Sequence, residues 1–303
     1  MKQVKFITGL MAFGVVSLFA GCGEKENEMT KVTLNEVAHS IFYAPQYVAL
    51  ENGYFTQEGL DLDLVTGYGA DKTMAAVISG EAQIGFMGAE ASVYAYLEGA
   101  NDPVINFAQG TQRAGNFLVA REEMADFQWS DLKGKEVLGG RKGGMPEMVF
   151  EYILKENGLD PAKELSIDQS IDFGSTAAAF SGGKGEFTVE FEPAATTLEK
   201  NGDGFVVASL GVDSGYVPYT SYSAKTSYVE KHPEIIQAFT DGLQKGVDYV
   251  NSHTAEEIAK VIQPQFKEND LDTITRIVER YQSQDTWKEN LVFEKESFEL
   301  LQD

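Results

Sequence analysis

Over its first two thirds, the chain alternates short β-rich runs with longer helical runs, and this alternation constrains the fold more than any other feature. Residues 31–37, 60–66, 82–88 and 103–110 have the alternating or continuous apolar pattern of strands. The runs between them, 43–53, 71–80 and 90–99, have helical spacing, and each ends at a glycine. Strands that alternate with helices predict βαβ units and a mostly parallel sheet.

The same alternation continues after residue 116. Strands are predicted at 116–120, 135–140, 164–170, 186–191 and 204–210, and helices at 146–157, 174–181 and 193–201. From residue 232 onward the pattern is almost entirely helical. We therefore predict an α/β protein of two lobes between which the chain crosses. Ligands of such sheets bind beyond the carboxyl ends of the strands, so two facing lobes would share one cleft.

The N-terminus has the pattern of an export signal. Two lysines precede the apolar, uncharged stretch ITGLMAFGVVSLFA, which is too short for an ordinary membrane span. The only cysteine, Cys22, follows this stretch directly after Ala-Gly, an arrangement that resembles a bacterial lipobox. We predict a lipoprotein signal peptide at 1–21, a lipidated Cys22, a polar tether at 22–30 and a protein held on the outer face of a cell membrane. The alternative is a plain secretory signal with an incidental cysteine.

The charge of the chain excludes one class of partner. It has 47 acidic and 24 basic residues, a formal net charge of −23, and no basic cluster to offset it. Such a surface repels nucleic acid. The histidines, His39, His232 and His253, lack the spacing of metal ligands, and no Ser-His-Asp set or acid–base pair can be identified. The sequence therefore predicts no metal, no cofactor and no enzymatic activity.

The stretch GGRKGGMPEM invites a nucleotide-binding interpretation, which its spacing does not support. A P-loop needs Ser or Thr after its Gly-Lys pair, but Gly143 follows Lys142, and the G-x-G-x-x-G spacing is absent. What remains is a strand, a glycine turn and a helix that Pro146 can begin. Because glycines let the backbone approach a ligand closely, we predict that Gly143, Gly144 and Met145 form one wall of a cleft.

Five segments of the chain, in order, resemble the substrate-binding proteins of ABC importers. They are HSIFYAPQYVALENGYFTQEGLDLDLV, GADKTMAAVISGEAQIGFMGAEASVYAYLEG, WSDLKGKEVLGGRKGG, FEPAATTLEKNG and YVPYTSYSAKTSYVEKHPEIIQAFTDGL. The subfamily is the one that contains the alkanesulfonate-, taurine- and nitrate-binding proteins and the thiamine-pyrimidine-precursor-binding proteins. The resemblance extends from about Val32 to about residue 250, and AxxxGYFxxEGLD is its most specific part.

This resemblance implies a periplasmic-binding-protein fold of type II, in which two lobes close over a small molecule and deliver it to a permease. Each lobe is then a mostly parallel sheet flanked by helices, with the ligand cleft between the lobes. We place lobe one at 31–116 plus 221–303 and lobe two at 117–220, with NFLVA and TSYSA as the crossing strands.

The candidate ligand contacts lie on the loops that follow the strands. In the arrangement that the resemblance implies, Ser40, Tyr43 and Pro45 face the cleft, and Glu192 is placed there by its position in the motif FEP. The loops that precede the helices contribute small residues, whose N–H groups can approach a ligand. The full predicted set is Ser40, Tyr43, Pro45, Gly69, Ala70, Gly88, Ala89, Glu90, Gly143, Gly144, Met145, Glu190, Glu192, Tyr219, Thr220 and Tyr222.

Several of these residues also have an ordinary structural explanation. Glu90 at a helix N-terminus is stabilised by the helix dipole whether or not it touches a ligand. Asp71 before the second helix is more simply explained as its N-cap, which is the commoner use of Asp at that position. Glu190 and Glu192 share one face of a strand because they are two residues apart, but either can point to solvent.

The resemblance implies that the partners are a small-molecule ligand and the permease and ATPase subunits of an ABC importer. The tyrosines, together with Glu90, Glu190 and Glu192, favour a nitrogen heterocycle such as an aminopyrimidine precursor of thiamine, because carboxylates suit N–H donors and positive charge. The alternatives are a sulfonate, taurine or nitrate, held by helix N-termini with Arg141 or Lys142, and a flavin-like or other aromatic vitamin.

Two other classes of function remain open from the sequence. The fungal thiamine-pyrimidine synthases share the implied fold, but they are intracellular and carry a cysteine-rich motif, whereas this chain has an export signal and a single cysteine. A ligand sensor that signals to a membrane partner other than a permease is the second alternative.

Overall fold

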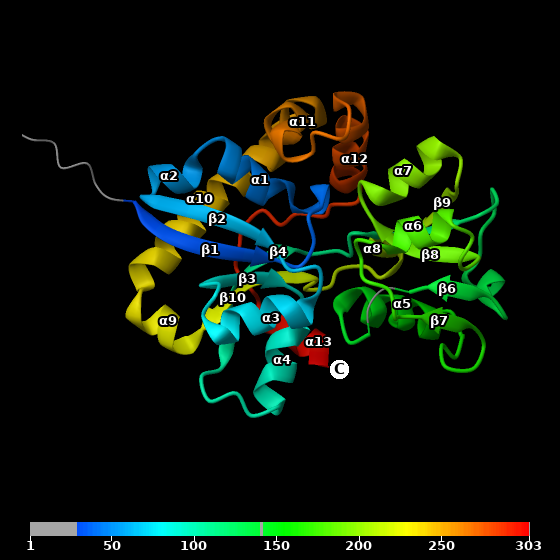
Figure 1. The fold of residues 1–303 in the computed structure, drawn as a ribbon, viewed down its shortest axis with the longest axis horizontal. Coiled ribbons are helices and arrows are strands. Elements are labelled where there is room, and N and C mark those ends of the chain that lie inside the picture. The colour runs from blue at the N-terminus through cyan, green and yellow to red at the C-terminus, as the bar shows by residue number, and fades with distance from the viewer. Residues whose placement is uncertain (1–28, 140–141, 303) are drawn as a thin grey trace, which may run out of the picture.

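The computed structural model describes residues 29–139 and 142–302. The predicted signal peptide, Cys22 and Arg141 lie outside these residues. Two five-stranded sheets organise the chain, and each is flanked by helices (Figure 1). The predicted α/β architecture of two lobes is therefore confirmed, and the lobe boundaries at 116/117 and 220/221 stay a prediction.

The first sheet has the strand order β2-β1-β3-β10-β4. Its strands are β1 (Thr30–Glu36), β2 (Leu60–Thr66), β3 (Ile84–Met87), β4 (Val104–Thr111) and β10 (Thr220–Lys225). The helices connected to it are η1 (Ile41–Tyr43), α1 (Ala44–Glu51), α2 (Tyr54–Gln57), α3 (Ala70–Ser79), α4 (Glu90–Leu97), α9 (Thr226–Lys231) and α10 (Pro233–Ser252). The three βαβ connections that the alternation predicted are all present.

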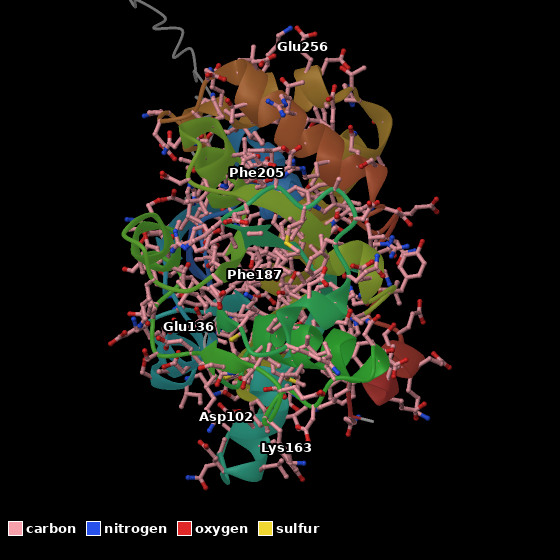
Figure 2. All side chains as sticks on the ribbon, turned by 90° about the vertical axis from the view of Figure 1, so that its right-hand side faces the viewer. Asp102, Glu136, Lys163, Phe187, Phe205 and Glu256 are labelled. Carbon is pink, nitrogen blue, oxygen red and sulfur yellow. The ribbon has the colours of Figure 1, made fainter. Side chains whose placement is uncertain are left out.

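The second sheet has the order β7-β6-β8-β5-β9. Its strands are β5 (Asn116–Ala120), β6 (Glu136–Leu138), β7 (Ser166–Asp168), β8 (Phe187–Phe191) and β9 (Phe205–Ser209). Its helices are η2 (Trp129–Leu132), α5 (Met145–Glu156), α6 (Thr176–Ser181), α7 (Ala194–Asn201) and α8 (Leu210–Asp213). Figure 2 views this side of the molecule: Phe187 lies in the interior, and the charged side chains of Glu256 and Lys163 lie at opposite edges.

One strand in each sheet runs against the others. β10 pairs antiparallel with β3 and β4, and β5 pairs antiparallel with β8 and β9. The chain passes from the first sheet to the second between β4 and β5, through only residues 112–115, and returns to the first sheet in β10. The reversed strands are the two that were predicted to cross.

The C-terminal part of the chain adds further helices after α10. They are α11 (Ala255–Ile262), η3 (Gln263–Gln265), α12 (Leu271–Ser283) and α13 (Lys295–Gln302). Figure 1 shows α12 between the two halves of the molecule, and α12 packs on η1 of the first half. Within residues 29–139 and 142–302, no helix has the length and apolar character needed to cross a membrane.

Candidate ligand cleft

A cleft of about 420 Å³ lies between elements of the two sheets. The first half contributes η1, α3 and α4 along most of their lengths and the start of β10, and the second half contributes the glycine-rich loop with the first turn of α5, the loop after β7 and the last residue of β8. Among its lining residues are Val37, Tyr43, Ala70, Asp71, Met74, Gly88, Glu90, Tyr94, Lys142, Gly143, Gly144, Met145, Phe173, Phe191, Tyr219 and Thr220. The loops at strand ends therefore converge as a doubly wound arrangement requires.

Most of the predicted contacts line this cleft. They are Tyr43, Ala70, Gly88, Glu90, Gly143, Gly144, Met145, Tyr219 and Thr220. Gly69 is the residue before α3, and Ala89, before α4, is fully buried. The ligand role of each residue stays a prediction. The fold nevertheless brings these residues, predicted from five separate parts of the chain, to one cleft.

Aromatic rings form much of the wall. The Tyr43 ring lies 4.4 Å from that of Phe86, and the two rings of Phe173 and Phe191 are 5.6 Å apart in an edge-to-face arrangement. Flat apolar walls with few polar groups are typical of small-molecule sites, and rings of this kind stack on planar ligands. Phe173 and Phe191 were missed from the sequence. Phe191 immediately precedes Glu192, so its position at a strand end was the available signal.

Glu90 is the buried charge of the cleft. Its side chain comes from the first turn of α4, and the residue is only 3% exposed. Oε1 accepts a hydrogen bond of 3.1 Å from the N–H of Met145, the first residue of α5 on the opposite side of the cleft. Burial raises the pKa of Glu90 to about 7, although hydrogen bonds from its own N–H and that of Met145 favour the ionised form. Glu90 thus connects the two halves by a hydrogen bond, and with this pKa both its protonated and its ionised forms are populated near neutral pH.

Two polar atoms of the cleft lining have no partner within the described part of the protein. Four buried side-chain atoms are in this state, and Tyr43 Oη and Glu90 Oε2 are two of them. A third, Asn116 Nδ2, belongs to a residue whose Oδ1 accepts a hydrogen bond from the cleft-lining Tyr219 hydroxyl. Buried polar groups are almost always hydrogen-bonded. Two of the four exceptions therefore line one cleft, and a third belongs to a residue that is hydrogen-bonded to its lining.

The glycine-rich loop forms a wall, as predicted from its sequence. Gly143 has a φ of +81°, which a side chain would strain, and Gly144 precedes α5 in an extended conformation. Met145 begins the helix and Pro146 occupies its first turn. The exposed Lys142 also lines the cleft.

Ser40, Glu190 and Glu192 lie elsewhere, on a second cavity of about 550 Å³ that shares Phe173 and Phe191 with the cleft. The carboxylate of Glu190 accepts hydrogen bonds from the hydroxyls of Thr188 (2.6 Å) and Thr176 (3.0 Å). Burial raises the pKa of Glu190 to about 7. Both oxygens of this carboxylate therefore already have partners from the second sheet and α6.

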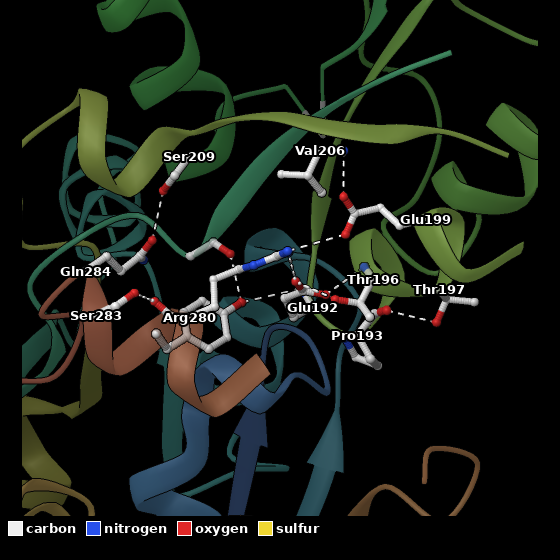
Figure 3. A network of polar contacts seen from close by, with 12 residues as sticks. Glu192, Pro193, Thr196, Thr197, Glu199, Val206, Ser209, Arg280, Ser283 and Gln284 are labelled. Atoms are coloured by element: carbon white, nitrogen blue, oxygen red, sulfur yellow. Dashed lines mark hydrogen bonds and ion pairs between the residues drawn. The ribbon is translucent and has the colours of Figure 1, made fainter. Parts of the chain in front are cut away.

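Glu192 differs most from its expected role. Its carboxylate accepts hydrogen bonds from the N–H and hydroxyl of Thr196, each 2.9 Å, and from Arg280 Nη1 on α12 at 2.5 Å (Figure 3). Its carbonyl oxygen accepts a hydrogen bond of 2.5 Å from the Ser40 hydroxyl. The residue predicted as a ligand contact is a bridge between the second sheet, α12 and the start of η1. Sequence reasoning missed Arg280 because it lies 88 residues away.

The remaining predicted contacts are internal. Pro45 and Tyr222 line a cavity of only about 10 Å³. The Tyr222 ring stacks on Phe86 at 4.0 Å, and its hydroxyl donates to Gln46 Oε1 at 3.1 Å. Tyr222 therefore supports the cleft wall from behind, with its hydroxyl already paired.

No group of three or more His, Cys, Asp or Glu side chains that could hold a metal ion is found among the described residues. The cleft lining provides aromatic surfaces, the desolvated carboxylate of Glu90, hydroxyls and the N-terminus of α5.

Comparison with known proteins places this geometry in a family. A sequence profile described as NMT1/THI5 like matches residues 41–257. The putative binding protein YtlA of Bacillus subtilis (strain 168) is 46% identical over 283 residues, which cover 93% of this chain and 84% of that protein.

Solved structures share the fold at low sequence identity. The alkanesulfonate-binding protein SsuA of Xanthomonas axonopodis pv. citri, bound to MOPS, has a TM-score of 0.70 at 15% identity and covers 83% of this chain and 84% of its own. A ligand-binding component of an ABC-type import system from Staphylococcus aureus, with zinc bound, has a TM-score of 0.72 at 16% identity and covers 90% of both chains.

Proposed function

Because the chain belongs to the NMT1/THI5-like family, we propose that it is the extracytoplasmic solute-binding component of an ABC importer and that its ligand is a neutral or cationic nitrogen heterocycle. An aminopyrimidine precursor of thiamine is an example of such a solute. The observation that carries this ligand class is the pair of unpartnered polar atoms, Tyr43 Oη and Glu90 Oε2, in an aromatic cleft within the described part of the chain.

The polar groups of the cleft match such a ligand in kind. An ionised Glu90 only accepts hydrogen bonds, so its free Oε2 calls for an N–H donor such as an exocyclic amine. The Tyr43 hydroxyl can donate to a ring nitrogen or accept from an amine. The rings of Tyr43, Phe173 and Phe191 supply surfaces against a planar heterocycle. A ligand that meets these groups would satisfy atoms that are costly to leave buried and unpaired.

A sulfonate, taurine or nitrate is the second candidate, favoured by a different observation. The helices α3, α4 and α5 all begin at the cleft, and Lys142 lines it. Helix N-termini with a nearby cation favour anions. The desolvated carboxylate of Glu90 opposes this alternative, because a second negative charge in a low-dielectric site is repelled.

Isothermal titration calorimetry with a small panel tests the ligand class. We expect purified protein to bind 4-amino-5-hydroxymethyl-2-methylpyrimidine with a micromolar or lower Kd and not to bind taurine or nitrate. Replacing Gly144 with Leu should weaken the binding, because the new side chain would enter the cleft, without lowering the thermal midpoint substantially. Micromolar taurine binding without aminopyrimidine binding would contradict the proposed ligand.

The proposed role is binding rather than chemistry. A ligand that contacts both halves favours the closed form only through tighter binding to it, and a permease can then recognise that form. A pyrimidine synthase of the same fold is the enzymatic alternative. Formation of a pyrimidine product by the purified protein with pyridoxal phosphate would overturn the non-enzymatic assignment.

We also propose that Cys22, which lies outside the described residues, is lipidated and anchors the protein to the extracytoplasmic face of a membrane. Metabolic labelling with a radioactive fatty acid should mark the full-length protein. The Cys22→Ala variant should remain unlabelled and appear in the soluble fraction. Equal labelling of both proteins would contradict the anchor.

A further inference from the structure

The N-terminal turn of α5 is a potential anion site whose space is already occupied by the protein. A helix of 12 residues begins there, and the first N–H groups of a helix have no partner within it and attract negative charge. The N–H of Met145 donates to Glu90 Oε1 at 3.1 Å, and the N–H of Gly143 donates to Glu147 Oε2. Carboxylates from two different helices thus stand where the acidic group of a solute would bind.

The backbone at Gly88 leaves room for the Glu90 carboxylate in this place. Gly88 lies two residues before Glu90, and a Cβ atom added there would lie 1.9 Å from Glu90 Oε2. No other residue type leaves room for the carboxylate in its present position. The side chain of Glu90 is buried, and Oε2 has no hydrogen-bond partner in the part of the chain that the structure covers. The site therefore combines a helix N-terminus with a buried carboxylate that has one oxygen free.

We propose that Glu90 is the specificity-determining residue of the cleft: its carboxylate fills the anion site at the α5 N-terminus, excludes anionic solutes and offers its second oxygen to an N–H donor. This inference rests on the proposed function as a solute receptor. It adds that one side chain decides between two chemical classes of solute in the same cleft. The exclusion works through repulsion as well as through occupied space, which is how binding proteins discriminate against an unwanted partner.

Removing the carboxylate should therefore change the class of ligand. In Glu90→Ala, the N–H of Met145 becomes free and the repelling charge is lost. We expect affinity for methanesulfonate and nitrate to rise by at least about tenfold, and affinity for the aminopyrimidine to fall by at least about tenfold. Both anions carry no amine, so neither can gain from Glu90. The titrations should be made at pH 8.5, where Glu90 of the wild-type protein is ionised, since its pKa is about 7.

Two further variants make the result decisive. Glu98→Ala removes an exposed carboxylate that lines the same cleft from the residue after α4, and it should gain no anion affinity. Glu90→Gln keeps the shape of the side chain but not its charge, and it serves if Glu90→Ala does not fold. Thermal melts of all variants establish that each is folded.

The outcomes separate this inference from the proposed function. Anion binding gained in folded Glu90→Ala or Glu90→Gln, but not in Glu98→Ala, supports the role of Glu90 even if wild-type protein binds no aminopyrimidine. Aminopyrimidine binding by wild type without anion gain in either Glu90 variant overturns the inference and leaves the proposed function standing. An equal gain in Glu98→Ala, or anion binding by wild type, also overturns it.

Discussion

Two carboxylates between the two halves of the molecule are equally buried but differ in their partners. Glu90 in the cleft and Glu192 beneath α12 are 3% and 1% exposed. Glu192 accepts hydrogen bonds from the N–H and hydroxyl of Thr196 and is ion-paired with Arg280 (Figure 3). Glu90 receives one hydrogen bond from across the cleft, and its Oε2 has no partner among the described residues.

This difference distinguishes a structural contact from a binding site. The α12 interface, formed by Glu192, Glu199, Arg280 and Gln284 with their partners, is complete without any ligand. A hydrogen-bond network in which every polar group has a partner rigidifies a fold. A buried polar group without a partner destabilises the folded state, so its presence calls for an explanation. The α12 interface therefore links the two sheets, whereas the cleft keeps unpaired polar groups, as the proposed role in solute binding requires. Substitutions at the two sites should have opposite consequences.

The largest effect is expected from Arg280→Ala. This change leaves the buried Glu192 without its cationic partner, and removing one member of a buried pair costs about 3–5 kcal/mol. The free energy of unfolding, measured with urea, should fall by that amount. Arg276→Ala on the exposed face of the same helix should change it by less than about 0.5 kcal/mol. Equal losses in the two variants would show that the α12 interface is not organised by this pair.

The pH dependence of stability should reveal the incomplete carboxylate. The pKa of Glu90 is about 7 in the folded protein because of burial, against 4.5 ordinarily. Folding then favours the protonated form, so its contribution is fully present below about pH 4.5 and is lost as pH rises through 7. Glu190 shifts in the same direction, also to about 7. The free energy of unfolding of the ligand-free protein should fall by about 2–3 kcal/mol per group between pH 5 and 8.

Glu90→Gln provides the comparison for this measurement. In this variant, the part of the pH-dependent fall in the free energy of unfolding that is due to Glu90 should disappear. At pH 8 the variant should be more stable than wild type by about 1–3 kcal/mol. Glu98→Gln, at an exposed position just after α4, should follow the wild-type profile. Superimposable profiles for wild type and Glu90→Gln would show that Glu90 is not a strained charge.

The secondary structure was predictable from the sequence, but these two roles were not. Strands and helices follow local patterns of a few residues, and 60–66 and 116–120 match β2 and β5 to the residue. The loops at strand ends were also found, because parallel strands bring their carboxyl ends to one edge. The partner of Glu192 lies on α12, far along the chain, and no local pattern links the two. The sequence therefore identified Glu90 and Glu192 as candidates without distinguishing their functions.

A smaller effect is expected from Tyr43→Phe, which removes an uncharged polar group of the cleft instead of a carboxylate. The Tyr43 hydroxyl is unpartnered in the described protein, so its removal should leave stability unchanged or raise it by up to about 1 kcal/mol. Calorimetry should show the aminopyrimidine bound about five- to tenfold more weakly. Tyr47→Phe is the contrasting variant: the Tyr47 hydroxyl donates to Glu36 Oε2 at 2.8 Å, and its loss should cost stability by about 1–3 kcal/mol. A stability loss in Tyr43→Phe would contradict the ligand role of the hydroxyl.

The smallest effect is expected at an exposed ion pair next in sequence to the cleft-lining residues Asp71 and Phe173. Lys72 on α3 pairs with Asp172 of the opposite half at 3.6 Å, and both side chains are about half exposed. Exposed pairs of this kind contribute between zero and about 1 kcal/mol. Lys72→Ala should therefore shift the urea midpoint only slightly and leave the Kd within about twofold. A tenfold change in Kd would mean that closure of the two halves over the ligand depends on the Lys72–Asp172 pair rather than on Glu90.

The most direct test is a crystal structure of the protein with 4-amino-5-hydroxymethyl-2-methylpyrimidine. We predict that the ring lies in the cleft against Tyr43 and Phe191, with its exocyclic amine within hydrogen-bonding distance of Glu90 Oε2 and the Glu192–Arg280 pair unchanged. A ligand bound in the second cavity against Glu190 and Glu192, or a ligand in the cleft without a hydrogen bond to Glu90, would contradict the account.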